Sequence, residues 1–172
     1  ALTEPRAKAD TILSHAEKTI SEKMDENPAF YRRLSQLIDE TIQAYREGRL
    51  SELELSQQAD AIRDLLREGE DNAVPSPLAG HRDAAAYYGI FTTTLEAEAE
   101  WMVTAALVAE KTIDGLKIRD WIGNLDVENR MKRALDDGLY DVLQDGGITL
   151  TDERLKALIE GLVIVARKRD AS

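Results

Sequence analysis

The sequence predicts an all-α protein, a single helical domain of about seven helices. Apolar residues recur at helical spacing along most of the 172 residues, and no stretch shows the alternation that is typical of a strand. Aromatic residues are sparse, at 5%, so we expect a core made mainly of Leu, Ile, Val and Ala. With 43% hydrophobic residues, a chain of this length can bury a substantial core.

The first part of the chain predicts three antiparallel helices joined by tight turns. The first covers residues 3–24. Asn27-Pro28 is a strong start for the second, because Asn caps the free amides of a first turn and Pro needs none there. Gly48 ends that helix, and Ser51 with Glu54 forms a capping box for the third.

Residues 69–80 predict a linker, because they combine two prolines, two glycines and mainly polar neighbours. The chain 1–172 is then either one helical domain with this loop inside it, or two helical subdomains, 1–68 and 81–172.

Four further helical segments follow this linker. A short one covers 84–91, and a longer one follows directly over 92–110. After an irregular connection, Asp126 is predicted to cap the next helix, which Gly146-Gly147 ends. Thr151 is predicted to start the last helix.

The last helix is apolar over more than one face. Ile164 and Val165 widen the stripe that Leu162 and Val163 belong to. Such a helix is either central in the core or docked to a partner, and the sequence favours neither.

Composition excludes several classes of function. The net charge is -11, so the bulk surface repels phosphate and anionic lipid. The chain has no cysteine, which excludes disulfides, thiolate zinc sites and thiol nucleophiles. No apolar run approaches the ~18 residues of a membrane span, and no signal peptide is visible. We expect a cytoplasmic protein with no membrane partner, and, since the chain begins at Ala1, a fragment or processed product.

No motif predicts catalysis, a cofactor or a metal. Phosphate-binding, dinucleotide-binding and serine-nucleophile motifs are absent from the sequence. His15 and His81 have no Glu three residues before them, so ordinary surface or capping roles are favoured. Glu96 and Glu100 are predicted to share a solvated helix face. The stretch 141–152 resembles a calcium loop but has Leu143 at a ligand position, and helix caps explain it more simply.

Basic residues gather around Trp121. Residues 115–133 carry five basic and three acidic side chains, a net +2 on an acidic chain. With the cluster 167–169, this is the candidate phosphate-facing surface, although charge balance within the acidic domain is the favoured interpretation. Trp121 itself is either a core anchor or an interface residue.

The chain resembles the C-terminal helical domain of the restriction (motor) subunit of type I restriction-modification enzymes. The resemblance is best over Ile12 to Leu66 and Tyr87 to Leu143. The stretches that carry it are Ile20 to Tyr31 (ISEKMDENPAFY), Tyr45 to Ser51 (YREGRLS), Ala86 to Gly89 (AYYG), and Asp120-Trp121, Asn124, Asp126-Val127 and Met131 in that order. Their order and spacing together are more specific than any one of them. Ile122-Gly123 is less polar than the family pattern after this Trp.

The resemblance implies a large multidomain parent subunit, an ATP-dependent type I site-specific deoxyribonuclease. Its nuclease and two DNA-translocating domains would lie upstream and would use ATP and Mg²⁺. The C-terminal region would carry no catalytic residue and would dock the motor onto the methyltransferase core, built of modification and specificity subunits, with double-stranded DNA close by.

Two functional hypotheses follow for this segment. In the first, it is an assembly domain whose protein interface includes Trp121, Asn124, Leu162, Val163, Ile164 and Val165. In the second, it is an accessory domain that contacts DNA without sequence preference through Lys117, Arg119, Arg130, Lys132, Arg133, Arg167, Lys168 and Arg169.

Overall fold

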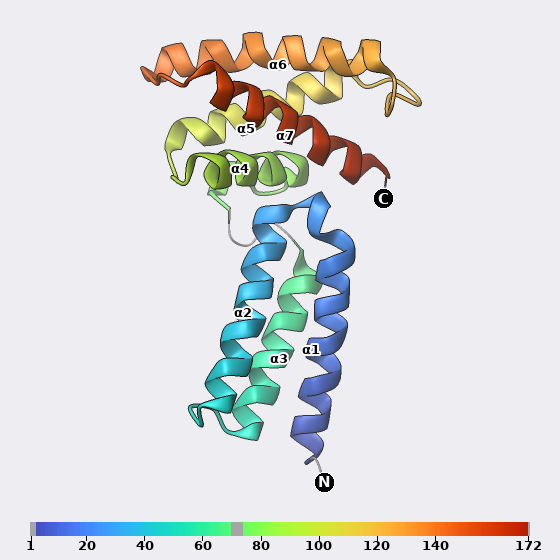
Figure 1. Ribbon diagram of the computed structural model, residues 1–172, viewed down its shortest axis with the longest axis vertical. Helices are drawn as coiled ribbons and strands as arrows, with labels where there is room; N and C mark the ends of the chain where they lie inside the picture. The colour runs from blue at the N-terminus through green and yellow to red at the C-terminus, as the bar shows by residue number, and fades with distance from the viewer. Residues whose placement is uncertain (1–2, 70–73, 172) are drawn as a thin grey trace.

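A computed structural model describes residues 3–69 and 74–171, and within them the chain forms helices and no strand (Figure 1). The predicted all-α class is therefore confirmed. The α-helices are α1 (Glu4–Lys23), α2 (Pro28–Arg46), α3 (Glu52–Glu68), α4 (Arg82–Leu95), α5 (Glu100–Leu116), α6 (Leu125–Gly146) and α7 (Asp152–Ala171). Two short 3₁₀ helices, η1 (Met24–Glu26) and η3 (Ser76–Leu78), lie in connections.

The helices form two groups whose axes cross. Helices α1, α2 and α3 run side by side as one bundle, and α4 to α7 pack across one end of it (Figure 1). Each group has its own hydrophobic core: one is built on Leu13, Phe30, Leu34 and Ile62, and the other on residues of α4 to α7 such as Phe91, Met131 and Leu158. The change from one core to the other falls at the predicted linker, part of which lies outside the described residues.

Local sequence signals position the first three helices as expected. The Asn27 side chain accepts a hydrogen bond from the Phe30 amide at 3.3 Å, and Pro28 opens α2. Ser51 accepts from the Glu54 amide at 3.1 Å, while Glu54 accepts from the Ser51 amide at 3.2 Å, which completes the capping box. Gly48 takes the left-handed conformation after α2. These predicted starts and stops are confirmed.

Helix boundaries after the linker differ from the prediction at the break between α4 and α5, at the cap of α6, and at the end of α5, which runs to Leu116 and not to 110. Helix α4 continues to Leu95. The helical path is then interrupted at 96–99, because Glu96 is in the left-handed conformation with φ 51°. Glu96 therefore ends one helix and Glu100 begins the next, so the predicted shared face does not exist. Asn124, rather than Asp126, caps α6 by accepting from the Val127 amide at 3.3 Å.

The last two helices are bounded as predicted. Gly147, with φ 66°, ends α6, and the Thr151 hydroxyl accepts from the Arg154 amide at 3.2 Å. Because α6 runs through Gly146, Asp141 and Asp145 belong to a helix and not to a calcium loop. No helix in the described part of the chain is long and apolar enough to cross a membrane.

A close helix contact joins the two groups. Helix α2 packs on α4, and η1 packs on α7. A Cβ placed on Gly89 of α4 would lie 2.6 Å from the Cβ of Ala29 on α2, so only glycine permits this approach. The C-terminus lies beside this junction, while the N-terminus lies at the far end of the bundle (Figure 1).

Candidate functional site

The connection between α5 and α6 folds over the indole of Trp121. Trp121 is 4% exposed, and its Nε1 donates a hydrogen bond to Asp170 on α7 at 2.9 Å. The backbone reverses direction here, because Asp120 and Gly123 both have positive φ and the Asn124 amide donates to the Trp121 carbonyl at 3.0 Å. Residues 117–125 are called the Trp121 turn below. The buried Trp121 side chain and its hydrogen bond to Asp170 fix this segment on α7.

A buried carboxylate fixes the second half of the turn. Glu128, on the first turn of α6, is 7% exposed. One of its oxygens accepts from the Gly123 amide at 3.0 Å, and the other lies 2.8 Å from Nε of Arg167 on α7. A buried charge is tolerated when it is both paired and hydrogen-bonded, as Glu128 is. The turn, α6 and α7 are therefore tied together at one point.

Four consecutive residues of α7 contact α6, η1, α4 and the Trp121 turn. Arg167 pairs with Glu128 of α6, and Lys168 lies 3.8 Å from Asp25 of η1. Arg169 donates to Asp83 of α4 at 2.7 Å and to the Glu26 carbonyl at 3.0 Å. Asp170 accepts from Trp121 and also pairs with Lys117 at 3.0 Å. The C-terminal end of α7, residues 167–170, joins the Trp121 turn to the junction between the two helix groups.

The outer surface of the Trp121 turn carries three apolar side chains among polar ones. Ile118 is 56% exposed, Ile122 is 42% exposed and Leu125 is 73% exposed. Arg119 and Asn124 are exposed on the same segment, and Arg130 is exposed on the next turn of α6. A short segment with three exposed apolar side chains, held in place by a buried Trp, has the character of a contact surface.

The predicted interface residues separate into buried and exposed groups. Leu162, Val163 and Val165 are at most 2% exposed and belong to the core of α4 to α7. The apolar stripe of α7 is wide because this helix packs on α4, α6 and η1 at once. Helix α7 is therefore central in the core, and these three residues are not a docking surface, nor is the buried ring of Trp121. Ile164 is 44% exposed, and Asn124 is exposed.

The predicted DNA-contacting cations also separate into two groups. Lys132 pairs with Glu160 at 2.9 Å, and Lys117 lies between Asp114 and Asp170. Burial lowers the pKa of Lys117, but the hydrogen bonds and charges of these two carboxylates outweigh it and raise the pKa overall. Of the eight cations, five are thus in ion pairs, while Arg119, Arg130 and Arg133 are exposed and form no ion pair within the described residues.

Sequence reasoning did not find the exposed apolar residues of the turn or the acidic partners on α7 and α4. A signal for the first was present: Ile118 and Ile122 stand in a connection whose other residues are mostly polar. The pairing of Asp83 with Arg169 has no local signal, because the two residues are far apart in the chain.

His81 lies beside a carboxylate that caps a helix. His81 Nδ1 lies 2.7 Å from Glu110, whose other carboxylate oxygen accepts from the Ala84 amide at 2.9 Å. Glu110 of α5 therefore caps the start of α4, and its charge suits the positive end of that helix. Residues 3–69 and 74–171 contain no group of three or more His, Asp or Glu side chains placed to bind a metal ion.

Comparison of the chain with protein-family models, with curated proteins and with solved structures finds no match.

Proposed function

We propose that this chain is a non-catalytic assembly domain: the C-terminal helical domain of a type I restriction motor subunit, which docks the motor onto the methyltransferase core. The family part of this proposal rests on the resemblance carried by residues 20–31, 45–51, 86–89 and 120–131. The observation that carries the docking part is the exposed apolar surface of the Trp121 turn. That surface replaces the α7 stripe as the candidate interface.

The turn is suited to docking because it is rigid on its inner side. Trp121 is anchored to Asp170, and Gly123 is anchored to Glu128. A preorganised segment loses little conformational entropy when a partner covers it. Ile118, Ile122 and Leu125 would supply the apolar centre of the contact, with Arg119 and Asn124 at its rim.

The test is co-migration of the chain with a purified cognate methyltransferase core, using a variant with Ile118→Asp, Ile122→Asp and Leu125→Asp. These side chains are exposed, so the fold should survive, while three buried carboxylates at the interface should weaken binding at least about 100-fold. Leu53→Asp on α3 is the matched control, since Leu53 is 60% exposed on the other helix group. Equal binding by both variants would contradict the docking surface, and no binding by the unaltered chain would contradict the assembly role.

A second candidate function is accessory contact with double-stranded DNA through Arg119, Arg130 and Arg133, the predicted cations that have no ion pair in the described structure. Three phosphate contacts give a slope of about -2.7 in log affinity against log salt concentration. We expect weak binding that is independent of sequence, and loss of that slope in the variant with Arg119→Glu, Arg130→Glu and Arg133→Glu. Affinity that does not change with salt would contradict DNA contact.

A further inference from the structure

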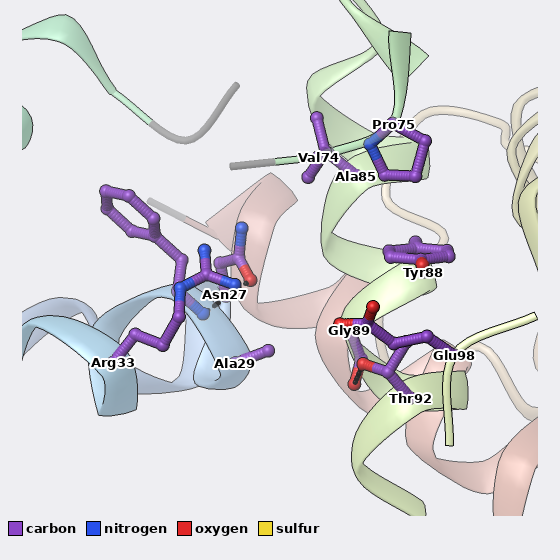
Figure 2. Close-up of a pocket in the computed structure, with 11 residues that line it drawn as sticks. Asn27, Ala29, Arg33, Val74, Pro75, Ala85, Tyr88, Gly89, Thr92 and Glu98 are labelled. Atoms are coloured by element: carbon purple, nitrogen blue, oxygen red, sulfur yellow. Dashed lines mark hydrogen bonds between the residues drawn. The ribbon is translucent and has the colours of Figure 1, made fainter. Parts of the chain in front are cut away.

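A groove runs between the segment 75–77 and the first half of α5. It has a volume of about 540 Å³ and lies beside a smaller cavity of about 270 Å³ at the junction of the two helix groups. Pro75, Tyr88 and Glu98 line both hollows, so the two are adjacent. Figure 2 shows the smaller one, with the Tyr88 ring between Pro75 and Glu98, and Arg33 of α2 across from them.

The walls of the groove are mainly apolar. Val103 and Leu107 of α5 are partly buried and stand one turn apart, so they form one stripe. Pro75 and Pro77 also line the groove, as does Tyr88, which is 9% exposed. Because proline has no amide hydrogen, Pro75 and Pro77 offer a bound segment no backbone donor, which favours recognition through side chains.

The charge in the groove has one sign. Glu98 and Glu100 line it, and no Lys, Arg or His does. Neither carboxylate forms an ion pair with a cation of the described residues. Tyr88 supports the same picture, since burial and the charge of Glu98 both raise its pKa. Arg33 lines the smaller cavity together with Glu98, whereas the part of the groove formed by α5 is lined by no cation of the described residues.

We propose that this hollow, called the Glu98 groove, binds a short polypeptide segment of a partner that carries a Lys or Arg beside apolar side chains. The cation would pair with Glu98 and Glu100, and the apolar side chains would cover Val103 and Leu107. The size is that of a ligand site, but an open apolar trough with few convergent polar groups suits a peptide better than a small molecule. The net charge of -11 would also attract a basic segment.

The groove is a different surface from the Trp121 turn. Glu100 begins α5, and the turn follows its last residue, Leu116. A helix of 17 residues is about 25 Å long, so the two surfaces lie at opposite ends of α5. The inference therefore goes beyond the proposed docking function and does not depend on it.

The experiment is selection of a random seven-residue peptide library, displayed on phage, against the whole chain. We expect enriched peptides that combine Lys or Arg with apolar residues. Synthetic copies should bind at least tenfold more weakly to the variant with Glu98→Lys and Glu100→Lys. The variant with Glu22→Lys and Asp137→Lys, which makes the same change in net charge at exposed positions outside the groove, should bind as the unaltered chain does.

A second variant tests whether peptide binding is lost when the groove is blocked without a change in charge. Thr104→Trp fills the groove from an exposed position on α5 without altering the core, so it should also abolish binding. Circular dichroism confirms that each variant is helical. Failure to enrich a basic–apolar motif, enrichment of acidic peptides, or peptides that compete at the Trp121 turn instead would overturn the proposal.

Discussion

At the scale of single residues, the hydroxyl of Tyr87 is a buried polar group without a hydrogen bond in the described structure. The side chain is 0% exposed in the core of α4 to α7, and its Oη has no hydrogen-bond partner among the described residues. Burial, together with the charges of Asp83, Asp114 and Asp170, raises its pKa far above the usual value. The hydroxyl thus costs stability at neutral pH and makes the fold sensitive to alkali.

We expect Tyr87→Phe to raise the free energy of unfolding by up to about 1 kcal/mol at pH 7, because a buried hydroxyl without a partner is removed. Below pH ~10 both the folded and the unfolded state keep the tyrosine proton. Above it the unfolded chain releases a proton that the folded chain holds, so the stability of the unaltered chain falls as pH rises. The variant should lose less stability between pH 9 and 11, as chemical denaturation at each pH would measure. The exposed Tyr140→Phe is the control, and a steeper alkaline loss in Tyr87→Phe would contradict the argument.

At the scale of helices, the seat of α2 on α4 depends on one glycine. A methyl group on Gly89 would meet Ala29 at 2.6 Å, closer than carbon atoms approach in proteins. Both residues lie in helices, so the contact is relieved only by a shift of one helix relative to the other.

Gly89→Ala is therefore expected to destabilise the chain by about 1–3 kcal/mol, although alanine is the better helix former. Gly115→Ala is the matched control, because a Cβ there would meet nothing within 4 Å. It lies in the last part of α5, so it should be neutral or stabilise by up to about 1 kcal/mol. Thermal unfolding followed by far-ultraviolet circular dichroism measures both changes. A stabilised Gly89→Ala would show that α2 is not seated on α4 in this way.

Helix limits could be predicted wherever the signal was local. Asn27-Pro28, Ser51 with Glu54, and Gly147 each satisfy free backbone groups within a few residues of themselves, so the sequence alone was sufficient. The end of α4 was missed because Glu96 takes a left-handed conformation that its residue type does not favour. No local pattern in the sequence marks this position.

The candidate site was predicted less well than the fold, for a physical reason. The pattern located Trp121 and the cations of 167–169, but their roles depend on partners distant in the chain. An arginine at position 169 could stabilise the C-terminal end of the helix dipole, bind a phosphate or form an ion pair. The residue type alone does not distinguish these three roles, and the structure shows the ion pair with Asp83. Stripe width showed correctly that α7 has more than one contact, but it could not say whether the neighbours belong to this chain.

At the scale of the whole molecule, two hydrophobic cores share one junction. The core of α4 to α7 is the larger, and the α1 to α3 bundle joins it through α2, η1 and Arg169. Arg169 is 13% exposed in its side chain and contacts Asp83 on one side of the junction and Glu26 on the other. Removing it would leave both acceptors poorly satisfied, so the coupling between the two cores should weaken more than either core does.

The positions of the two tryptophans make that coupling measurable. Trp101 lies in α5 and Trp121 in the turn after it, so tryptophan fluorescence reports only on the α4 to α7 group, whereas circular dichroism reports on all helices. In the unaltered chain we expect both signals to change together in denaturant, as one cooperative transition.

In Arg169→Leu, circular dichroism should change first, because the bundle with the smaller core unfolds before the fluorescent group. Arg130→Leu, an exposed arginine that forms no ion pair in the described structure, should leave the two transitions coincident. Separate transitions already in the unaltered chain, or coincident transitions in Arg169→Leu, would mean that this residue does not couple the two cores.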